Sequence, residues 1–376
     1  MPTGSLRVKK SGSRMSPTAV ALRWASLFLF LYAFLVSIGV LSAAFGLMGE
    51  GFVHSLFDSA SNPVVGLFVG ILATTLAQSS STTTSVVVAL VGGGTMDVST
   101  AIPVIMGANI GTSVTNTLVS LGHIRREDEF YRAFSASTVH DFFNILAVAI
   151  LFPIQVATDF LGILATGAAN LLADVGGLTF TSPLKTLTAP VVKAFVALFA
   201  DHPVLLLLAS LALMFAMLHR LVVTLKALVV SKAESFFDQS VFRNAFRGMM
   251  LGLLLTVLVQ SSSITTSLVV PLAGAGILSL RQIFPYTLGA NVGTTVTAIL
   301  ASLAVGELTA VTVALSHLFF NVIGIATIWP LPSIRRLPIR LSRAMARASI
   351  RNRWIPVAYI LIGFYFLPFV VIIALR

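Results

Sequence analysis

The chain has 376 residues, of which 57% are hydrophobic and only 10% are charged. A soluble protein of this size would carry about 25% charged residues. The composition therefore excludes a soluble enzyme and a nucleic-acid-binding domain, despite the net charge of +11. The mean hydropathy of +0.98 instead predicts a polytopic helical membrane protein.

The basic residues indicate which segments face the cytoplasm. Twenty of the 24 Lys and Arg residues lie in four short segments: 1–23, 125–132, 220–247 and 335–353. Because cytoplasmic loops are enriched in these residues, we place the four segments, and with them the N-terminus, in the cytoplasm. The stretch 153–202 holds only Lys185 and Lys193, and we expect it outside. The expected location is the cell (plasma or inner) membrane, with many passes.

Nine apolar runs follow one another along the chain. Seven are long enough to span a bilayer: 24–49, 98–124, 133–158, 203–230, 282–306, 308–334 and 354–375. Two more, 65–96 and 248–280, have polar clusters at their centres. A straight helix would place these hydroxyls in hydrocarbon, so we interpret each run as a re-entrant hairpin of two half-helices.

An internal repeat relates the two hairpins and the spans after them. The repeated segments are Gln78–Ser85 with Gln260–Ser267, Gly107–Thr112 with Gly289–Thr294, and His140–Asn144 with His317–Asn321. Their offsets are 182, 182 and 177 residues. The loop charges place the two copies in opposite orientations. Such inverted repeats are typical of secondary transporters, whose substrate site lies at the repeat interface near the membrane midplane.

The two Gln-Ser-Ser-Ser clusters favour a ligand site. Hydroxyl and amide groups donate and accept hydrogen bonds, and half-helix N-termini add N–H donors, so two meeting tips would suit an oxyanion. The same oxygens suit Na⁺. No Lys or Arg lies near the motifs, so a co-bound Na⁺ would supply the charge that a buried dianion needs. Helix packing through small hydroxyl residues is the alternative for each cluster alone.

The two Gly-Ala-Asn-x-Gly-Thr motifs follow Pro103 and Pro285 by four residues. Proline and paired glycines predict a transmembrane helix that breaks and frees carbonyl groups for ions. The alternative is a close contact between helices through small residues.

Asp141 is the only acidic residue in the middle of a predicted span. On a helix it shares a face with Asn144, and we predict that the two hold a cation. A carboxylate that only hydrogen-bonds a neighbouring helix is the alternative. The second copy has Leu318 at this position. His140 and His317 are either proton relays or structural partners of the asparagine four residues further on.

As a set, these motifs resemble the type II sodium-dependent phosphate cotransporters (the Na⁺/Pi cotransporter family), over about residues 62–152 and 245–325. The resemblance implies Na⁺-driven uptake of inorganic phosphate, and an acid at Asp141 accompanies electrogenic transport in that family. The chain lacks the cysteine-bearing extracellular loop of animal members and the soluble C-terminal domain of some bacterial relatives. It therefore looks like a compact bacterial member.

The resemblance also implies the residues of the site. Phosphate and Na⁺ would be bound by Gln78, Ser79, Ser80, Ser81, Gln260, Ser261, Ser262, Ser263, Asn109, Thr112, Thr117, Asn291, Thr294 and Thr297. The sodium site would involve Asp141, Asn144, Asn109 and Asn291.

We thus predict an all-α polytopic membrane protein with two inverted repeats, each containing a re-entrant helical hairpin and a broken transmembrane helix. The segments are a basic cytoplasmic N-terminus (1–22), a first transmembrane repeat (23–152, hairpin about 62–96), an extracytoplasmic connector (153–202), a second repeat (203–331, hairpin about 246–278), a basic cytoplasmic surface segment (332–353) and a final transmembrane helix (354–376).

The predicted function is import of inorganic phosphate in symport with Na⁺, and no enzyme activity. The expected partners are phosphate, Na⁺ and the lipid bilayer, with no nucleic acid, no cofactor besides Na⁺ as coupling ion, and an open oligomeric state. The alternatives are a Na⁺-coupled carrier of sulfate, arsenate or a dicarboxylate, a channel, and an intramembrane hydrolase. The hydrolase would need a general base beside its serine, and no lysine lies in the middle of a predicted span.

Overall fold

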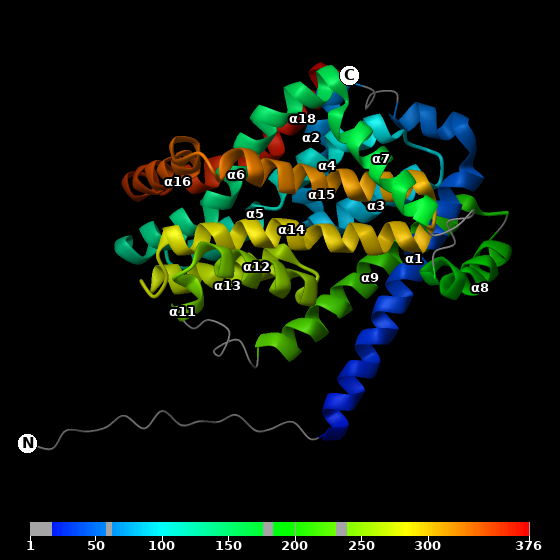
Figure 1. Cartoon of the computed structure of the whole chain (residues 1–376), viewed down its shortest axis with the longest axis horizontal. Helices are drawn as coiled ribbons and strands as arrows, with labels where there is room; N and C mark the ends of the chain where they lie inside the picture. Colours follow the sequence, from blue (N-terminus) through cyan, green and yellow to red (C-terminus); the bar gives the residue numbers. More distant parts are fainter. Residues whose placement is uncertain (1–16, 58–61, 176–182, 200, 231–238, 376) are drawn as a thin grey trace, which may run out of the picture.

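The computed structural model describes residues 17–57, 62–175, 183–199, 201–230 and 239–375. Most of the predicted cytoplasmic N-terminus, residues 1–16, therefore lies outside the described residues. So do parts of the predicted connector and of the basic segment 220–247. Within the described ranges the chain forms helices and no strand (Figure 1).

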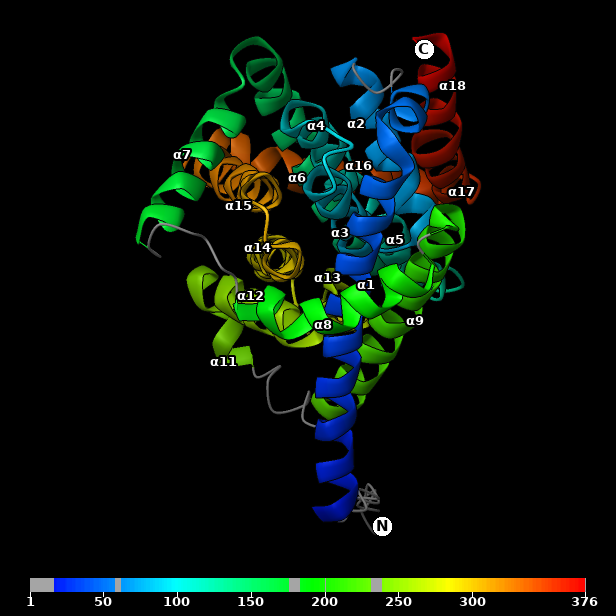
Figure 2. The same ribbon diagram turned by 90° about the vertical axis from the view of Figure 1, so that its right-hand side faces the viewer.

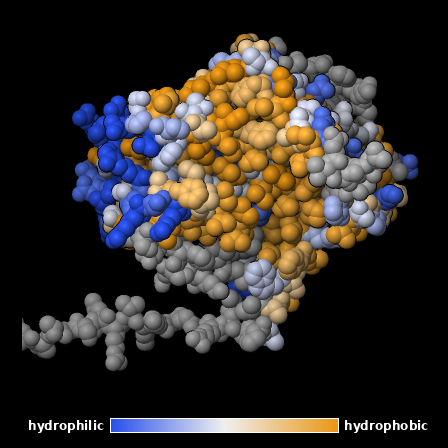
Figure 3. All heavy atoms as spheres, viewed as in Figure 1, coloured by the Kyte–Doolittle hydropathy of each residue, from blue (hydrophilic) through white to orange (hydrophobic). Residues whose placement is uncertain are grey.

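Seven stretches of the described residues are long and apolar enough to cross a membrane. They are Ala21–Met48 in α1 (Pro17–Phe57), α4 with α5 (Val98–Gly111 and Val114–Leu121), α6 (Glu127–Thr158), Pro203–Thr224 in α9 (Pro203–Val230), α14 (Leu280–Val305), α15 (Leu308–Ile328) and Ile355–Ala374. Each coincides with a run predicted from hydropathy. Figure 3 shows a broad hydrophobic band across the molecule, with most of the hydrophilic residues gathered at its left end and fewer at its right. The prediction of an all-α polytopic membrane protein is confirmed.

The two predicted hairpins are helix–turn–helix units with matching bounds. They consist of α2 (Pro63–Ala77) with α3 (Ser80–Gly92), and of α12 (Ala245–Val259) with α13 (Ser262–Gly274). All four helix bounds correspond at the offset of 182 residues found in the sequence. The opposite orientation of the two units in a bilayer stays a prediction.

Two residues produce each turn. Gln78 and Gln260 have left-handed backbones, with φ of 52° and 54°, which end α2 and α12. Ser79 and Ser261 then begin α3 and α13 as N-caps, because their hydroxyls accept the N–H of Thr82 (3.2 Å) and of Ile264 (3.4 Å). The Gln-Ser pair thus encodes the reversal of the chain.

The glycines of the Gly-Ala-Asn motifs fix the hairpins to the neighbouring spans. A Cβ on Gly107 of α4 would overlap the carbonyl oxygen of Leu67 in α2, and a Cβ on Gly289 of α14 would overlap that of Met249 in α12. Gly70 of α2 faces α4 and Gly252 of α12 faces α14, and a Cβ on either glycine would also overlap a backbone carbonyl oxygen. These glycines therefore serve close packing of two helices, the alternative considered for the motif.

The predicted broken helix exists in the first copy only. Between α4 and α5, the N–H of Ser113 donates to the carbonyl of Ile110 at 3.4 Å rather than to that of Asn109. The carbonyl of Asn109 accepts a hydrogen bond from the Asn144 side chain instead. In the second copy α14 runs unbroken from 280 to 305, so the prediction of a break there was wrong. A break needs a partner for the freed carbonyl, and no side chain takes that role for Asn291 among the described residues.

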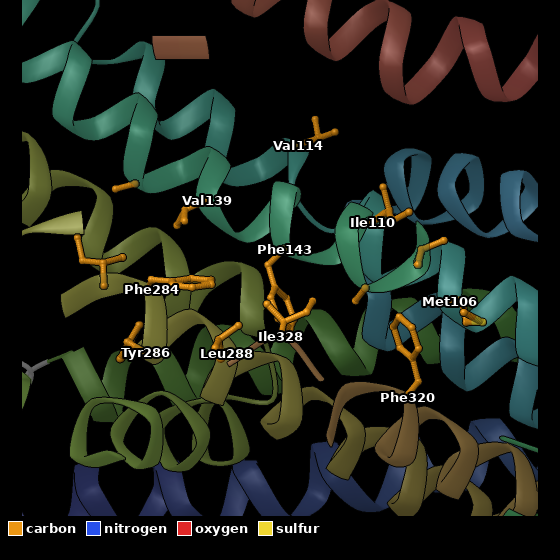
Figure 4. Packing of buried hydrophobic residues seen from close by; sticks show 14 of the residues in the cluster. Met106, Ile110, Val114, Val139, Phe143, Phe284, Tyr286, Leu288, Phe320 and Ile328 are labelled. Carbon is orange, nitrogen blue, oxygen red and sulfur yellow. The ribbon is translucent and has the colours of Figure 1, made fainter. Parts of the chain in front are cut away.

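Helix α14 lies at the centre of the fold, and Figure 2 shows it almost end-on. Its first half, with Phe284 and Leu288, belongs to a buried cluster that also includes Phe143 of α6 and Phe320 of α15 (Figure 4). Its second half packs in another cluster with α1, α3 and α9. Asn291 lies along α14 between the residues of the two clusters.

The remaining helices surround this centre. They are α7 (Phe160–Val175) along α15, α8 (Pro183–Leu198) along α1, the short α11 (Gln239–Phe242), α16 (Pro332–Arg351) along α6, and the last span, made of α17 (Ile355–Ile360), the π-helix η2 (Leu361–Phe366) and α18 (Leu367–Ala374). The predicted connector 153–202 is thus largely helical where the structure describes it.

Candidate functional site

The glutamine at each hairpin tip is held by the same two bonds. Thr115 Oγ1 donates to Gln78 Oε1 at 2.9 Å, and Thr297 Oγ1 donates to Gln260 Oε1 at 2.9 Å. Each Nε2 donates back to its own helix, at 2.5 Å to the carbonyl of Thr75 and at 2.6 Å to that of Val257. The glutamine amides therefore shape and anchor the tips.

The serines after each turn carry unused hydrogen-bonding groups. Ser80, Ser81 and Ser262 are each 4% exposed and Ser263 is 7% exposed. Their hydroxyls make no hydrogen bond within the part of the chain that the structure describes, whereas Ser79 and Ser261 act as caps. The backbone N–H groups of the first helical residues have no intrahelical acceptor, and the helix dipole makes this end positive. Each tip thus offers donors suited to an anion.

Helix α5 brings the two hairpins together through adjacent residues. Thr115 binds the first tip, as described above. Asn116 Nδ2 donates to Thr266 Oγ1 of α13 at 2.8 Å, and Ser267 Oγ donates to Asn116 Oδ1 at 2.8 Å. Both hairpins therefore contact one turn of the same helix.

The threonines named from the sequence play different roles. Thr297 contacts its tip, but Thr112, Thr117 and Thr294 donate to carbonyls of their own helices, at 3.0, 3.3 and 3.1 Å. The resemblance suggested Thr117 as a site residue, whereas in the structure Thr115 is the threonine that contacts the first tip. The 182-residue offset between Thr115 and Thr297 was the sequence signal for this contact.

The predicted ion-site asparagines meet in a buried polar network. Asn291 Nδ2 donates to Asn144 Oδ1 at 2.7 Å, and Asn144 Nδ2 donates to the carbonyl of Asn109 at 2.9 Å. His140 Nε2 contacts Asn291 Oδ1. Ser113 Oγ lies 3.4 Å from His140 Nδ1. Helices α4, α6 and α14 are thereby joined, with His140 in contact with both Ser113 and Asn291.

Asp141 lies beside this network and faces another helix. Its side chain is fully buried, and Oδ2 accepts from the hydroxyl of Tyr359 in the last span at 3.1 Å. Oδ1 has no hydrogen-bond partner, and its nearest basic group is His140 Nδ1 at 3.9 Å. No hydrogen bond joins Asp141 to Asn144 in the described residues. A buried carboxylate oxygen without a partner is costly, which makes Asp141 a candidate functional residue.

The sequence did not indicate Tyr359 or Asn116. Tyr359 is 218 residues from Asp141 and lies in an ordinary apolar span. Asn116 has Ala298 at the corresponding position of the second copy, so the repeat gave no signal.

The second copy of the histidine motif differs from the first. Both ring nitrogens of His317 and Oδ1 of Asn321 are buried without a hydrogen-bond partner. Leu318 stands where the first copy has Asp141. Among the described residues, a hydrogen-bonded histidine–asparagine network therefore forms around His140 but not around His317.

Comparison with known proteins adds to this geometry. The Na⁺/Pi-cotransporter family matches residues 29–179 and 206–329, which include both tips and the asparagine network. The chain is 36% identical to sodium-dependent phosphate transport protein 2A of Ovis aries and of Rattus norvegicus, over 90% of this chain and 65% of each relative. It is 32% identical to sodium-dependent phosphate transport protein 2B of Homo sapiens, over 91% of this chain and 64% of the relative.

The chain thus spans slightly less than two thirds of the length of these relatives. No solved structure matches it. The match to the family covers most of the chain and contains every repeated motif, so the resemblance seen in the sequence is confirmed. The chain belongs to the Na⁺/Pi-cotransporter family.

Proposed function

We propose that the chain is a secondary transporter that imports inorganic phosphate in symport with Na⁺. The observation that carries this proposal is the pair of matching hairpins, both hydrogen-bonded to α5, the first through its tip and the second through α13. Each tip offers buried serine hydroxyls and N–H groups that have no partner among the residues the structure describes. Such donors suit an oxyanion, and the relatives are named sodium-dependent phosphate transport proteins.

The charges support coupling to Na⁺. Neither tip motif contains Lys or Arg, so a phosphate dianion would be bound without a fixed cation. Na⁺ supplies that charge and accepts hydroxyl and carbonyl oxygens as ligands. We propose Asp141 Oδ1 as one ligand, with Asn109, Asn144 and Asn291 as the framework beside it. A carboxylate at this point favours electrogenic transport.

The rival functions fit less well. In the described residues, no serine of the two Gln-Ser-Ser-Ser clusters hydrogen-bonds a histidine or a carboxylate, so a hydrolase that used one of these serines has no general base beside it. A channel would not need two equivalent tips. A carrier of sulfate, arsenate or a dicarboxylate shares the donor chemistry, and competition separates it from a phosphate carrier.

The proposed location is the cell membrane, with the basic segments inside. Arg353 donates to the carbonyl of Ile124 at 2.8 Å and lies 3.2 Å from Glu127 Oε1. The basic segments 125–132 and 335–353 therefore lie at the same end of the molecule, which supports a common cytoplasmic side.

The test is uptake of radiolabelled phosphate by proteoliposomes. We expect uptake with an inward Na⁺ gradient, none with K⁺ or choline, and a rise when the interior is made negative. Excess sulfate or dicarboxylate should leave the uptake unchanged. Na⁺-independent uptake, or stronger inhibition by another oxyanion than by unlabelled phosphate, would reject the proposal.

A further inference from the structure

A basic cavity lies between α16 and the start of α14, away from the hairpin tips. Its volume is about 630 Å³, and five arginines line it: Arg281, Arg335, Arg336, Arg340 and Arg343. No carboxylate lines the cavity, and none of the five pairs with an acid in the described part of the chain. The hydrophilic end in Figure 3 coincides with the place of α16 in Figure 1.

The sequence of α16 places the arginines on one side. Arg336, Arg340 and Arg343 are spaced i, i+4 and i+7, whereas Ser342, Ala346 and Ser349 are buried where α16 packs along α6. Like charges at this spacing destabilise a helix, so the helix gains from an anion that neutralises them.

Two aromatic rings hold part of the cavity wall in place. The guanidinium of Arg335 lies 4.8 Å from the centre of the Trp329 ring, and Phe284 packs against the same tryptophan at 5.9 Å. A stacked guanidinium keeps its N–H edge free for oxygens. All five basic residues are arginines, whose forked donors match the oxygens of a phosphate group.

The surroundings distinguish a lipid from a free phosphate ion. Leu331, Leu337 and Leu341 are 38–49% exposed next to the arginines, and Phe246 is 67% exposed next to the lining residue Ala245. A free phosphate ion would make no favourable contact with these apolar groups, whereas the acyl chains of a lipid would cover them. Tryptophan is also typical of the membrane–water interface.

We propose that this cavity binds the phosphate groups of an anionic phospholipid, with the acyl chains against the exposed leucines. The volume admits a head group with two phosphates. The lipid would contact Ala245 at the start of α12 and Arg281 at the start of α14, the helix that carries Asn291. This site does not depend on the transported substrate, and the arginines of α16 follow the last residue that the family matches.

The chain offers a matched pair of variants. R336Q/R340Q removes two arginines from the cavity, and R347Q/R351Q removes two with the same spacing on the same helix that line a different cavity. The measurement is mass spectrometry of the intact purified protein with a mixture of cardiolipin, phosphatidylglycerol and phosphatidylethanolamine. We expect wild type and R347Q/R351Q to retain cardiolipin, and R336Q/R340Q to retain it at least about tenfold less.

Three results would overturn the proposal. Equal losses in both double variants would assign the binding to the general charge of α16. Equal retention of cardiolipin and phosphatidylethanolamine by wild type would exclude a phosphate-reading site. Displacement of cardiolipin by millimolar inorganic phosphate would make this a site for the free ion. If R336Q/R340Q does not elute as a monodisperse protein, R281Q at the opposite wall serves as the test, with the same expected loss.

Discussion

Thr115 and Thr297 make the same hydrogen bond in two different environments. Each Oγ1 donates to the Oε1 of a tip glutamine at 2.9 Å. Gln78 is exposed, whereas Gln260 is 9% exposed. Replacing either threonine by valine removes the hydroxyl and keeps the β-branched shape. The two variants therefore compare the loss of the same hydrogen bond at an exposed glutamine and at a buried one.

The expected costs differ because of burial. In Thr297→Val, Gln260 Oε1 loses its partner in a buried position, which costs about 1–3 kcal/mol. In Thr115→Val, water replaces the lost donor at the exposed Gln78, so the cost is at most about 1 kcal/mol. If the tip must be held for substrate to bind, these energies correspond to roughly 5- to 150-fold and at most roughly fivefold increases in the KM for phosphate.

Phosphate uptake by proteoliposomes at saturating Na⁺ measures the two KM values. Thr312→Val is the control, since that buried threonine donates only to its own helix, at 3.0 Å to the carbonyl of Leu308. A larger effect for Thr115→Val than for Thr297→Val would refute the reasoning from burial. Unchanged KM in both would show that the glutamines do not position the tips for substrate.

Three further predictions concern the serines, the carboxylate and the packing of the hairpins. Ser262→Ala should lower kcat/KM for phosphate more than about tenfold, since it removes a hydroxyl that we propose to bind the charged phosphate, whereas Ser210→Ala, which removes a hydroxyl bonded to its own helix, should not. Normal uptake by Ser262→Ala would reject the tip as the binding site. Asp141→Asn should reduce the charge moved per phosphate, and an unchanged ratio of current to uptake would exclude Asp141 as a cation ligand. Gly252→Ala should lower the Tm, because the new methyl group would overlap a backbone carbonyl at a cost of about 1–3 kcal/mol. Gly167→Ala is the control, because a methyl group there meets open space. Equal Tm values for the two variants would contradict this prediction.

The sequence was sufficient for the spans and the hairpins. Hydropathy located all seven candidate spans, because each must be apolar over its full length. The central polar clusters indicated both hairpins, because a straight helix would place their hydroxyls in hydrocarbon. The matching helix bounds follow from the repeat, since both copies carry the same local signals.

The remaining features depend on contacts between distant segments. Pro285 and the following glycines suggested a break in α14, yet the glycines serve packing against α12 and the helix continues. The break after α4 depends on Asn144, which takes the freed carbonyl of Asn109 from another helix. Tyr359 reaches Asp141 from the last span, and no local pattern encodes such a contact.

The two halves share their hairpins but differ in the later span that carries the histidine motif, α6 in the first half and α15 in the second. The tip bonds and the glycine contacts occur twice with the same geometry. The carboxylate occurs once, because Asp141 of α6 corresponds to Leu318 of α15. The groups suited to the anion are therefore duplicated, whereas the intramembrane negative charge is single. If both tips bind one phosphate and Asp141 binds a coupling ion, as we propose, the ion that adds charge to the cycle is bound by the first half alone. Substitutions at the tips then change the affinity for substrate. Coupling is instead measured by the charge moved per phosphate in variants of Asp141.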